Sequence, residues 1–165
     1  MRKAPPGSRA RTAGTVGHYG FAAPADAACV MAAIEAHAHW DFFALPCNYL
    51  TLNACAGLPD AVTFAGREEL GMIAVDPFAE GRLEQVPAEV HELFRNAPVP
   101  RSHDEWALRA VWERQETVSL VWEAQNADQL MRKAIFAEAG RPNSLPSREL
   151  DVLARAAAKL SENKA

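Results

Sequence analysis

Short apolar segments alternate with helical segments along most of this chain, and this alternation restricts the fold more than any other feature. Four segments have strand character, the first of them weakly: residues 12–16, 41–45, 72–75 and 118–122. Each of them is followed by a pattern of helical period. Short apolar strands that alternate with helices are typical of parallel strands buried on both faces. The sequence therefore predicts an α/β domain with four parallel strands and flanking helices.

Several local signals mark where helices begin. Ser102 followed by Glu105 forms a capping box, and Asn126 with Gln129 resembles a second one. Pro146 precedes an amphipathic pattern that runs through Leu160. We therefore expect helices after residues 102 and 126, and a C-terminal helix that packs on the rest of the domain.

The N-terminal segment differs from the remainder of the chain. Residues 1–11 carry Arg2, Lys3, Arg9 and Arg11 without any acidic residue, and they include two prolines and a glycine. This composition predicts a disordered basic arm over residues 1–11. Residues 12–165 are long enough for one domain with its own core.

Charge and cysteine usage limit the partners and the compartment. The net charge of -4 gives no reason to expect binding to nucleic acid or to an anionic membrane. No apolar stretch approaches the roughly 20 residues that span a bilayer. Cys29, Cys47 and Cys55 contain no C-x-x-C motif and match no zinc spacing with the histidines, so no metal site is expected. An odd cysteine count indicates a reducing cytoplasm.

The order of several segments resembles the second half of an aldo/keto reductase. The segments "GTVGHYG", "HWDFFALPCNYL" and "ELGMIAVDPFAEGRL" are similar to that family's fifth, sixth and seventh strands with their loops. The stretch "EWALRAVWERQETVSLVWEAQNADQL" resembles the following helix, the eighth strand and the turn into the next helix. The segment "PNSLPSREL" resembles the closing part. The resemblance covers about residues 12–155.

This resemblance implies the C-terminal half of a (β/α)8 barrel, since a whole barrel needs about 250 residues and carries its site at the carboxyl ends of the strands. In the family, this half makes most of the NADP(H) site. The catalytic Asp, Tyr, Lys and His belong to the first half, so the resemblance implies no catalytic residue here. A carbonyl or alcohol oxidoreductase that is truncated and inactive alone is the expected function.

The resemblance also implies which residues would contact the cofactor. The loop after residue 75 has small residues that let backbone amides approach a pyrophosphate, and the turn after residue 122 leads into a helix whose N-terminus favours an anion. The implied cofactor-binding residues are Pro77, Phe78, Ala79, Gly81, Gln125, Asn126 and Gln129. Glu80 and Glu123 place negative charge beside the same phosphate path, which is unfavourable.

Other ligand positions of the family have changed in this chain. The Ser and polar residue that end the fifth strand correspond to Val16 and Gly17, and the amide-binding Gln of the sixth strand corresponds to Ala44. An aromatic residue is replaced by Cys47, although Asn48 is kept. The Asn expected near the adenine is Lys133, which would either contact a ribose phosphate, as Arg132 also could, or remain a solvated helix residue.

Half a barrel leaves two open strand edges and an uncovered inner face, so it should not be a stable monomer. A homodimer would close an eight-stranded barrel, and a separate chain carrying the first half would do the same. The loss of ligand residues leaves open an alternative function: a non-catalytic interaction or small-molecule-binding protein built on a reductase-derived half-barrel.

Overall fold

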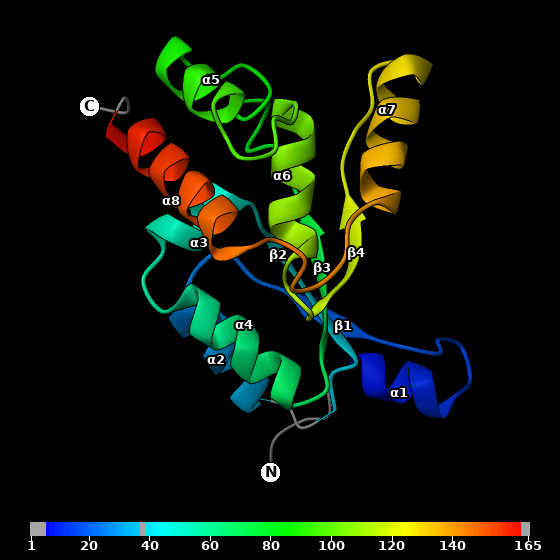
Figure 1. Ribbon diagram of the computed structural model, residues 1–165. Coiled ribbons are helices and arrows are strands. Elements are labelled where there is room, and N and C mark those ends of the chain that lie inside the picture. Colours follow the sequence, from blue (N-terminus) through cyan, green and yellow to red (C-terminus); the bar gives the residue numbers. More distant parts are fainter. Residues whose placement is uncertain (1–5, 37–38, 163–165) are drawn as a thin grey trace.

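A computed structural model describes residues 6–36 and 39–162 (Figure 1). The elements, in chain order, are α1 (Pro6–Thr12), β1 (Gly20–Ala22), α2 (Ala27–Ala36), β2 (Phe42–Pro46), α3 (Tyr49–Ala54), α4 (Leu58–Arg67), β3 (Gly71–Val75), α5 (Ala88–Arg95), α6 (His103–Trp112), β4 (Thr117–Val121), α7 (Ala127–Glu138) and α8 (Ser147–Glu162). Helices therefore separate every pair of successive strands.

The four strands form one parallel sheet in the order β1-β2-β3-β4. Phe43 and Leu45 of β2, with Met72 and Ala74 of β3, are buried under α2 and α4, whereas the residues between them are only half-buried. Alternation with a period of two puts the half-buried residues on the other face of the sheet. The predicted fold, an α/β half-barrel of four parallel strands with flanking helices and a C-terminal helix, is confirmed.

A second apolar cluster lies between the helices that follow β2, β3 and β4. The rings of Phe94 and Trp106 stack with their centroids 5.4 Å apart, and α8 adds Val152, Leu153 and other buried side chains. The buried carboxylate of Glu149 accepts a hydrogen bond of 2.6 Å from Arg101, which joins α8 to the segment before α6. The C-terminal helix is thus an integral part of the core.

The first strand begins later in the chain than the sequence indicates. Residues 12–16 form the end of α1 and a turn, and β1 covers Gly20–Ala22 instead. A Cβ at Gly20 would lie 2.1 Å from the carbonyl oxygen of Phe42, so this strand pairs closely only because residue 20 is glycine. The phenyl ring of Phe21 stacks at 5.9 Å on Phe43. These contacts across the sheet place the strand where no strong local signal exists.

Two helices correct the expectations from sequence. Residues 6–12 form α1 where a disordered arm was expected, and the guanidinium of Arg11 bonds the carboxylate of Asp41 at 3.0 Å. Residues 1–5 lie outside the described part of the chain. Helix α3 follows Asn48, whose side chain accepts from the amides of Leu50 and Thr51 while Thr51 accepts from the amide of Asn48. This capping box uses threonine in place of the usual Glu or Gln.

Within the described residues the sheet has an open edge at each end, because β1 and β4 each pair there with one strand only. Helix α7 follows β4, the strand at one edge of the sheet (Figure 1). Five of the eight exposed large apolar side chains among the described residues belong to these two elements. These five, which we call the β4–α7 face, are Val118, Val121, Leu130, Met131 and Ile135. In the described part of the chain, no helix combines the length and the apolar character needed to cross a bilayer.

Candidate functional site

Parallel strands bring all four carboxyl ends to one edge of the sheet, which is where (β/α)8 barrels carry their sites. The strands end at Ala22, Pro46, Val75 and Val121. Cys47 and Asn48 follow β2, and Asp76 follows β3. The amide nitrogen of Asn48 donates to the backbone carbonyl oxygen of Asp76 at 3.2 Å, so one side chain both caps α3 and holds the start of the next loop.

The loop after β3 contains an unusual run of left-handed backbone conformations. Asp76, Ala79 and Glu80 have φ angles of 50°, 51° and 56°, and Gly81 has 83°. Non-glycine residues adopt this region at a cost of order 1–3 kcal/mol each. The amide of Glu80 donates to Asp76 Oδ1 at 2.8 Å, which closes the loop on itself. The side chain of Asp76 therefore helps to hold the loop in this conformation.

A partly buried ion pair connects this loop to α7. The ammonium of Lys133 lies 2.7 Å from Glu84 Oε1, and the same oxygen accepts from the side-chain amide of Gln129 at 3.1 Å. The Lys133 ammonium also lies 3.7 Å from the ring centroid of Phe78, within the range of a cation–π interaction. The side chain of Lys133 is 1% exposed and that of Glu84 is 28% exposed. The expectation of a solvated Lys133 is therefore wrong, and sequence reasoning missed Glu84 altogether.

The N-terminus of α7 is capped by its own side chains. Asn126 Oδ1 accepts from the amide of Gln129 at 2.8 Å, and Gln129 Oε1 accepts from the amide of Gln125 at 2.8 Å. Both ends of the Gln129 amide group are thus occupied, one by Gln125 and the other by Glu84. The cap predicted at Asn126 is present, but two of the amides that would face an anion already have protein acceptors.

A cavity of about 450 Å³ lies between the N-terminal part of α7 and the segments before α5 and α6. Its charged lining includes the acids Glu84 and Asp104 and the basic side chain of Arg132. Because Lys133 neutralises Glu84, an anionic ligand in this cavity would face only one additional permanent cation, at Arg132. Such a balance favours a weakly charged ligand over a polyphosphate.

The residues expected to bind a cofactor lie in two segments, the loop after β3 and the start of α7. Pro77 and Phe78 are buried, Ala79 and Gly81 are half-buried in the loop turn, and none of these four lines the cavity. Gln125 and Gln129 line the cavity, and Asn126 is exposed beside them. Glu84 is the link between the two segments, through Gln129 and Lys133.

Four positions at the ends of β1 and β2 do not fit a nicotinamide. The resemblance places Val16 and Gly17 at the end of this strand, but β1 covers Gly20–Ala22, so Ala22 and Ala23 stand at the strand end instead. Ala44 lies beside Ala22 in the sheet register. Cys47 is buried, and burial raises the pKa of its thiol to about 12. None of these residues offers a polar side chain to a carboxamide, so we derive no chemical step through this cofactor.

Four parallel strands in sequential order, with helices over one face, form half of a (β/α)8 barrel. Solved structures of aldo-keto reductases share this fold. The chain aligns with aldo-keto reductase AKR11C1 from Bacillus halodurans, in its holo and apo forms, with a TM-score of 0.67 and 16% identity in both comparisons. These alignments cover 93% of this chain and 53% or 54% of AKR11C1.

A second aldo-keto reductase gives the same result. The thermostable enzyme Tm1743, solved with the inhibitor epalrestat, aligns with a TM-score of 0.62 and 12% identity over 90% of this chain and 52% of its own. No family model and no curated protein matches the sequence. The similarity therefore shows the fold, and the chain spans about half the length of these reductases.

Proposed function

We propose that this chain is the rear half of an aldo/keto reductase-type barrel that acts in assembly with a second four-stranded half and has no reductase activity alone. By the resemblance, the complete family consists of NADP(H)-dependent oxidoreductases of carbonyl and alcohol groups, whose catalytic side chains belong to the front half. The chain would then supply the edge of the barrel that faces the nucleotide.

The observation that supports assembly is the apolar β4–α7 face. Val118 and Val121 on the open edge strand are 60% and 53% exposed, and Met131 and Ile135 on α7 are 63% and 60% exposed. Exposed apolar side chains beside an unpaired strand edge mark an interaction surface or an aggregation site. In an eight-stranded barrel, further strands and helices would cover this surface.

A second copy of the chain is the partner that we propose to test first. A two-fold axis that brings β4 of one copy beside β1 of the other would close eight strands and leave no open edge. No additional chain is needed for this closure. A separate front-half chain is the other partner, and only that assembly would restore the catalytic residues.

Light scattering after size exclusion, at several protein concentrations, measures the assembly. We expect a mass twice the 18.0 kDa of one chain. Ile135→Lys should dissociate the dimer, whereas Val99→Lys, which changes another exposed apolar residue outside the β4–α7 face, should not. A monomer at every concentration, or equal behaviour of the two variants, would contradict the second copy.

A non-catalytic small-molecule-binding or interaction protein is the second candidate function, and the ion pair between Lys133 and Glu84 favours it. This pair uses the side chains of α7 and the loop for internal contacts, while Ala22, Ala23 and Ala44 offer no polar side chain to a nicotinamide. In that case the protein would have the fold of a reductase but would not catalyse the reductase reaction.

Titration with NADPH separates the two functions. Binding is followed by calorimetry and by the fluorescence of Trp122, which lies directly after β4; Trp122→Phe identifies its part of the signal. The non-catalytic function predicts no saturation up to about 1 mM, which is close to the weakest binding of practical use. Micromolar binding would favour a split reductase, and turnover of an aldehyde by the chain alone would refute the proposed inactivity.

A further inference from the structure

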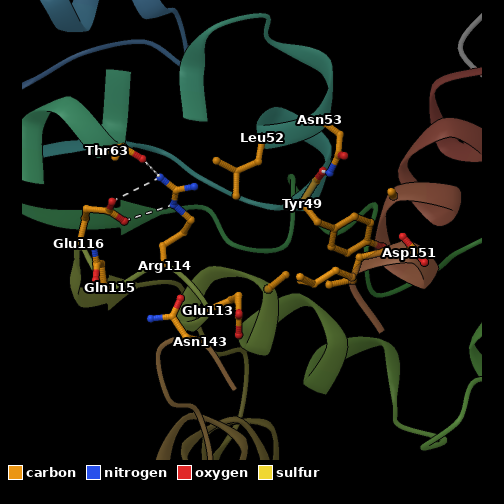
Figure 2. A pocket seen from close by; sticks show the side chains of 14 residues that line it. Tyr49, Leu52, Asn53, Thr63, Glu113, Arg114, Gln115, Glu116, Asn143 and Asp151 are labelled. Carbon is orange, nitrogen blue, oxygen red and sulfur yellow. Dashed lines mark hydrogen bonds and ion pairs between the residues drawn. The ribbon is translucent and has the colours of Figure 1, made fainter. Parts of the chain in front are cut away.

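The cation in a cavity between α3, α4, α6 and α8 is used within the protein. The guanidinium of Arg114 donates to Thr63 Oγ1 at 2.8 Å, and its Nε lies 3.2 Å from Glu116 Oε2 (Figure 2). The hydroxyl of Tyr49, in the same lining, is buried in the protein. Among the described residues that line this cavity, no cation is therefore left free for a ligand.

Two imidazole rings meet at a different place in the helical layer, between α5 and the start of α6. Nδ1 of His91 lies 3.1 Å from Nε2 of His103, and this contact is exposed to solvent. Both rings line a cavity of about 540 Å³. The two residues are 12 positions apart, a spacing outside the common zinc motifs, so only the fold brings them together.

The core of the protein sets the positions of both rings. His91 precedes Phe94 by three residues on α5, so their side chains lie on one face of that helix. The ring centroids of Phe94 and His103 lie 5.8 Å apart, and Phe94 also stacks on Trp106, one turn further along α6. Helices that are packed in this way hold the imidazoles in place before a ligand binds, which lowers the cost of binding.

A backbone carbonyl sets the tautomer of His103. Its Nδ1 lies 3.3 Å from the carbonyl oxygen of Glu84, which can only accept, so Nδ1 carries the proton and Nε2 keeps its lone pair. Histidines that bind metals typically donate their second ring nitrogen to a carbonyl or carboxylate oxygen in this way. Without a metal, Nδ1 of His91 donates to Nε2 of His103; with its proton on Nε2 instead, His91 presents a second lone pair.

The distance between the two nitrogens fits a shared metal ion. Imidazole nitrogens bind zinc at about 2.0–2.1 Å, so two of them on one ion lie about 2.8–3.4 Å apart at angles of about 90–110°. The observed 3.1 Å falls within this range. In the described part of the chain, no group of three or more His, Cys, Asp or Glu side chains is arranged to hold a metal ion. Water would therefore fill the other coordination positions.

The arginines beside the pair have carboxylate partners of their own. Arg95 lies 2.8 Å from Glu92, and Arg101 lies 2.6 Å from Glu149 and 3.3 Å from Glu105. Both arginines line the same cavity as the two histidines. Because their charges are balanced, they do not repel a cation strongly.

We propose that His91 Nδ1 and His103 Nε2 bind one divalent transition-metal ion such as zinc. Imidazole suits zinc, copper and nickel, whereas magnesium prefers oxygen ligands. With two protein ligands we expect a Kd on the order of 10–100 µM, far weaker than that of a closed four-ligand site. Neither histidine belongs to the β4–α7 face or to the residues expected to bind the cofactor, so the site does not depend on the proposed function.

Titration of the purified chain with zinc measures the site by calorimetry and by the nitrogen-15 shifts of the imidazoles. We expect saturable binding in which His91 Nδ1 and His103 Nε2 shift most, because these two atoms would contact the ion. Magnesium at the same concentrations should produce neither heat nor shifts. No saturable change up to about 1 mM zinc, or the largest shifts at other nitrogens, would overturn the proposal.

Two variants of matched shape separate metal binding from the hydrogen bond. His91→Asn places an amide near the position of Nδ1, and His103→Gln does so near the position of Nε2, so each keeps hydrogen-bonding capacity but removes an imidazole ligand. Each should weaken zinc binding roughly tenfold or more, with little change in the urea midpoint of the zinc-free protein.

Two further variants are controls for zinc binding elsewhere in the chain. His39→Gln and Cys29→Ser each remove an exposed side chain of a type that binds zinc, outside the histidine pair, and should leave the affinity unchanged. Full zinc affinity in His91→Asn and His103→Gln, or an equal loss in either control, would show that the ion binds elsewhere and would refute the site.

Discussion

Removal of Glu84 should destabilise the protein because it leaves the ammonium of Lys133 buried without a counter-charge. Loss of one partner of a buried pair typically costs about 3–5 kcal/mol. Glu84 is 28% exposed, so water entering the gap recovers part of this cost, and the contact with Phe78 remains. Gln129 cannot replace the carboxylate with its Nε2, which is a donor. We expect Glu84→Ala to lower the free energy of unfolding by about 2–3 kcal/mol.

Urea denaturation measures this loss, which should lower the midpoint by roughly 1 M for a typical m-value. Glu89→Ala is the control, since Glu89 pairs with Lys159 at the surface, with side chains 71% and 38% exposed, and should cost at most about 0.5 kcal/mol. Adding Lys133→Met to Glu84→Ala should restore most of the stability. Equal costs for Glu84→Ala and Glu89→Ala would show that Lys133 does not depend on Glu84.

Four further changes have expected outcomes. Tyr49→Phe should raise the free energy of unfolding by about 1 kcal/mol in urea, because it removes an unpaired buried hydroxyl. Gly20→Ala should unpair β1, seen as faster amide exchange there, because its Cβ would lie 2.1 Å from the oxygen of Phe42. The backbone amide of Tyr19 donates to Asp41 and holds the pKa of its carboxyl below the usual value. The ionised carboxylate therefore stabilises the fold above the usual pKa, and this stabilisation is lost as the pH falls through the lowered pKa. Asp41→Asn should therefore make the free energy of unfolding less dependent on pH in the acid range. Cys47, with its pKa raised to about 12, should resist alkylation at pH 8 until the protein unfolds.

The sequence predicts this fold well wherever the signal is local. β2, β3 and β4 are apolar runs bounded by turn residues, and the caps at Ser102 and Asn126 lie at the predicted helix starts. These features depend on neighbours within a few residues. The parallel order then follows from the alternation of strands and helices.

The first strand was predicted at the wrong residues because its position does not depend on local sequence. β1 has three residues and depends on contacts with β2, among them the stacking of Phe21 on Phe43 and the close backbone approach at Gly20. Residues 12–16 contain Thr and Val but join no sheet. Sequence reasoning assigned the right number of strands and the wrong residues to the weakest of them.

The candidate site was less predictable because its central contact joins residues far apart in sequence. Lys133 and Glu84 are 49 positions apart, and each is ordinary in its local setting. Only the docking of α7 against the loop after β3 brings them together. Lysine is rarely buried unless it is paired, and the local sequence around Lys133 does not reveal its partner.

Contacts within the protein hold the loop after β3 in its conformation. Ala79 and Glu80 hold left-handed conformations, which cost free energy unless other contacts impose them. Asp76 accepts from the amide of Glu80, while Glu84 binds Lys133 on α7, so protein groups impose the loop shape. These contacts account for the loop conformation with groups of the protein itself. The conformation of this loop is therefore weaker support for cofactor binding than polar side chains in contact with the cofactor would be.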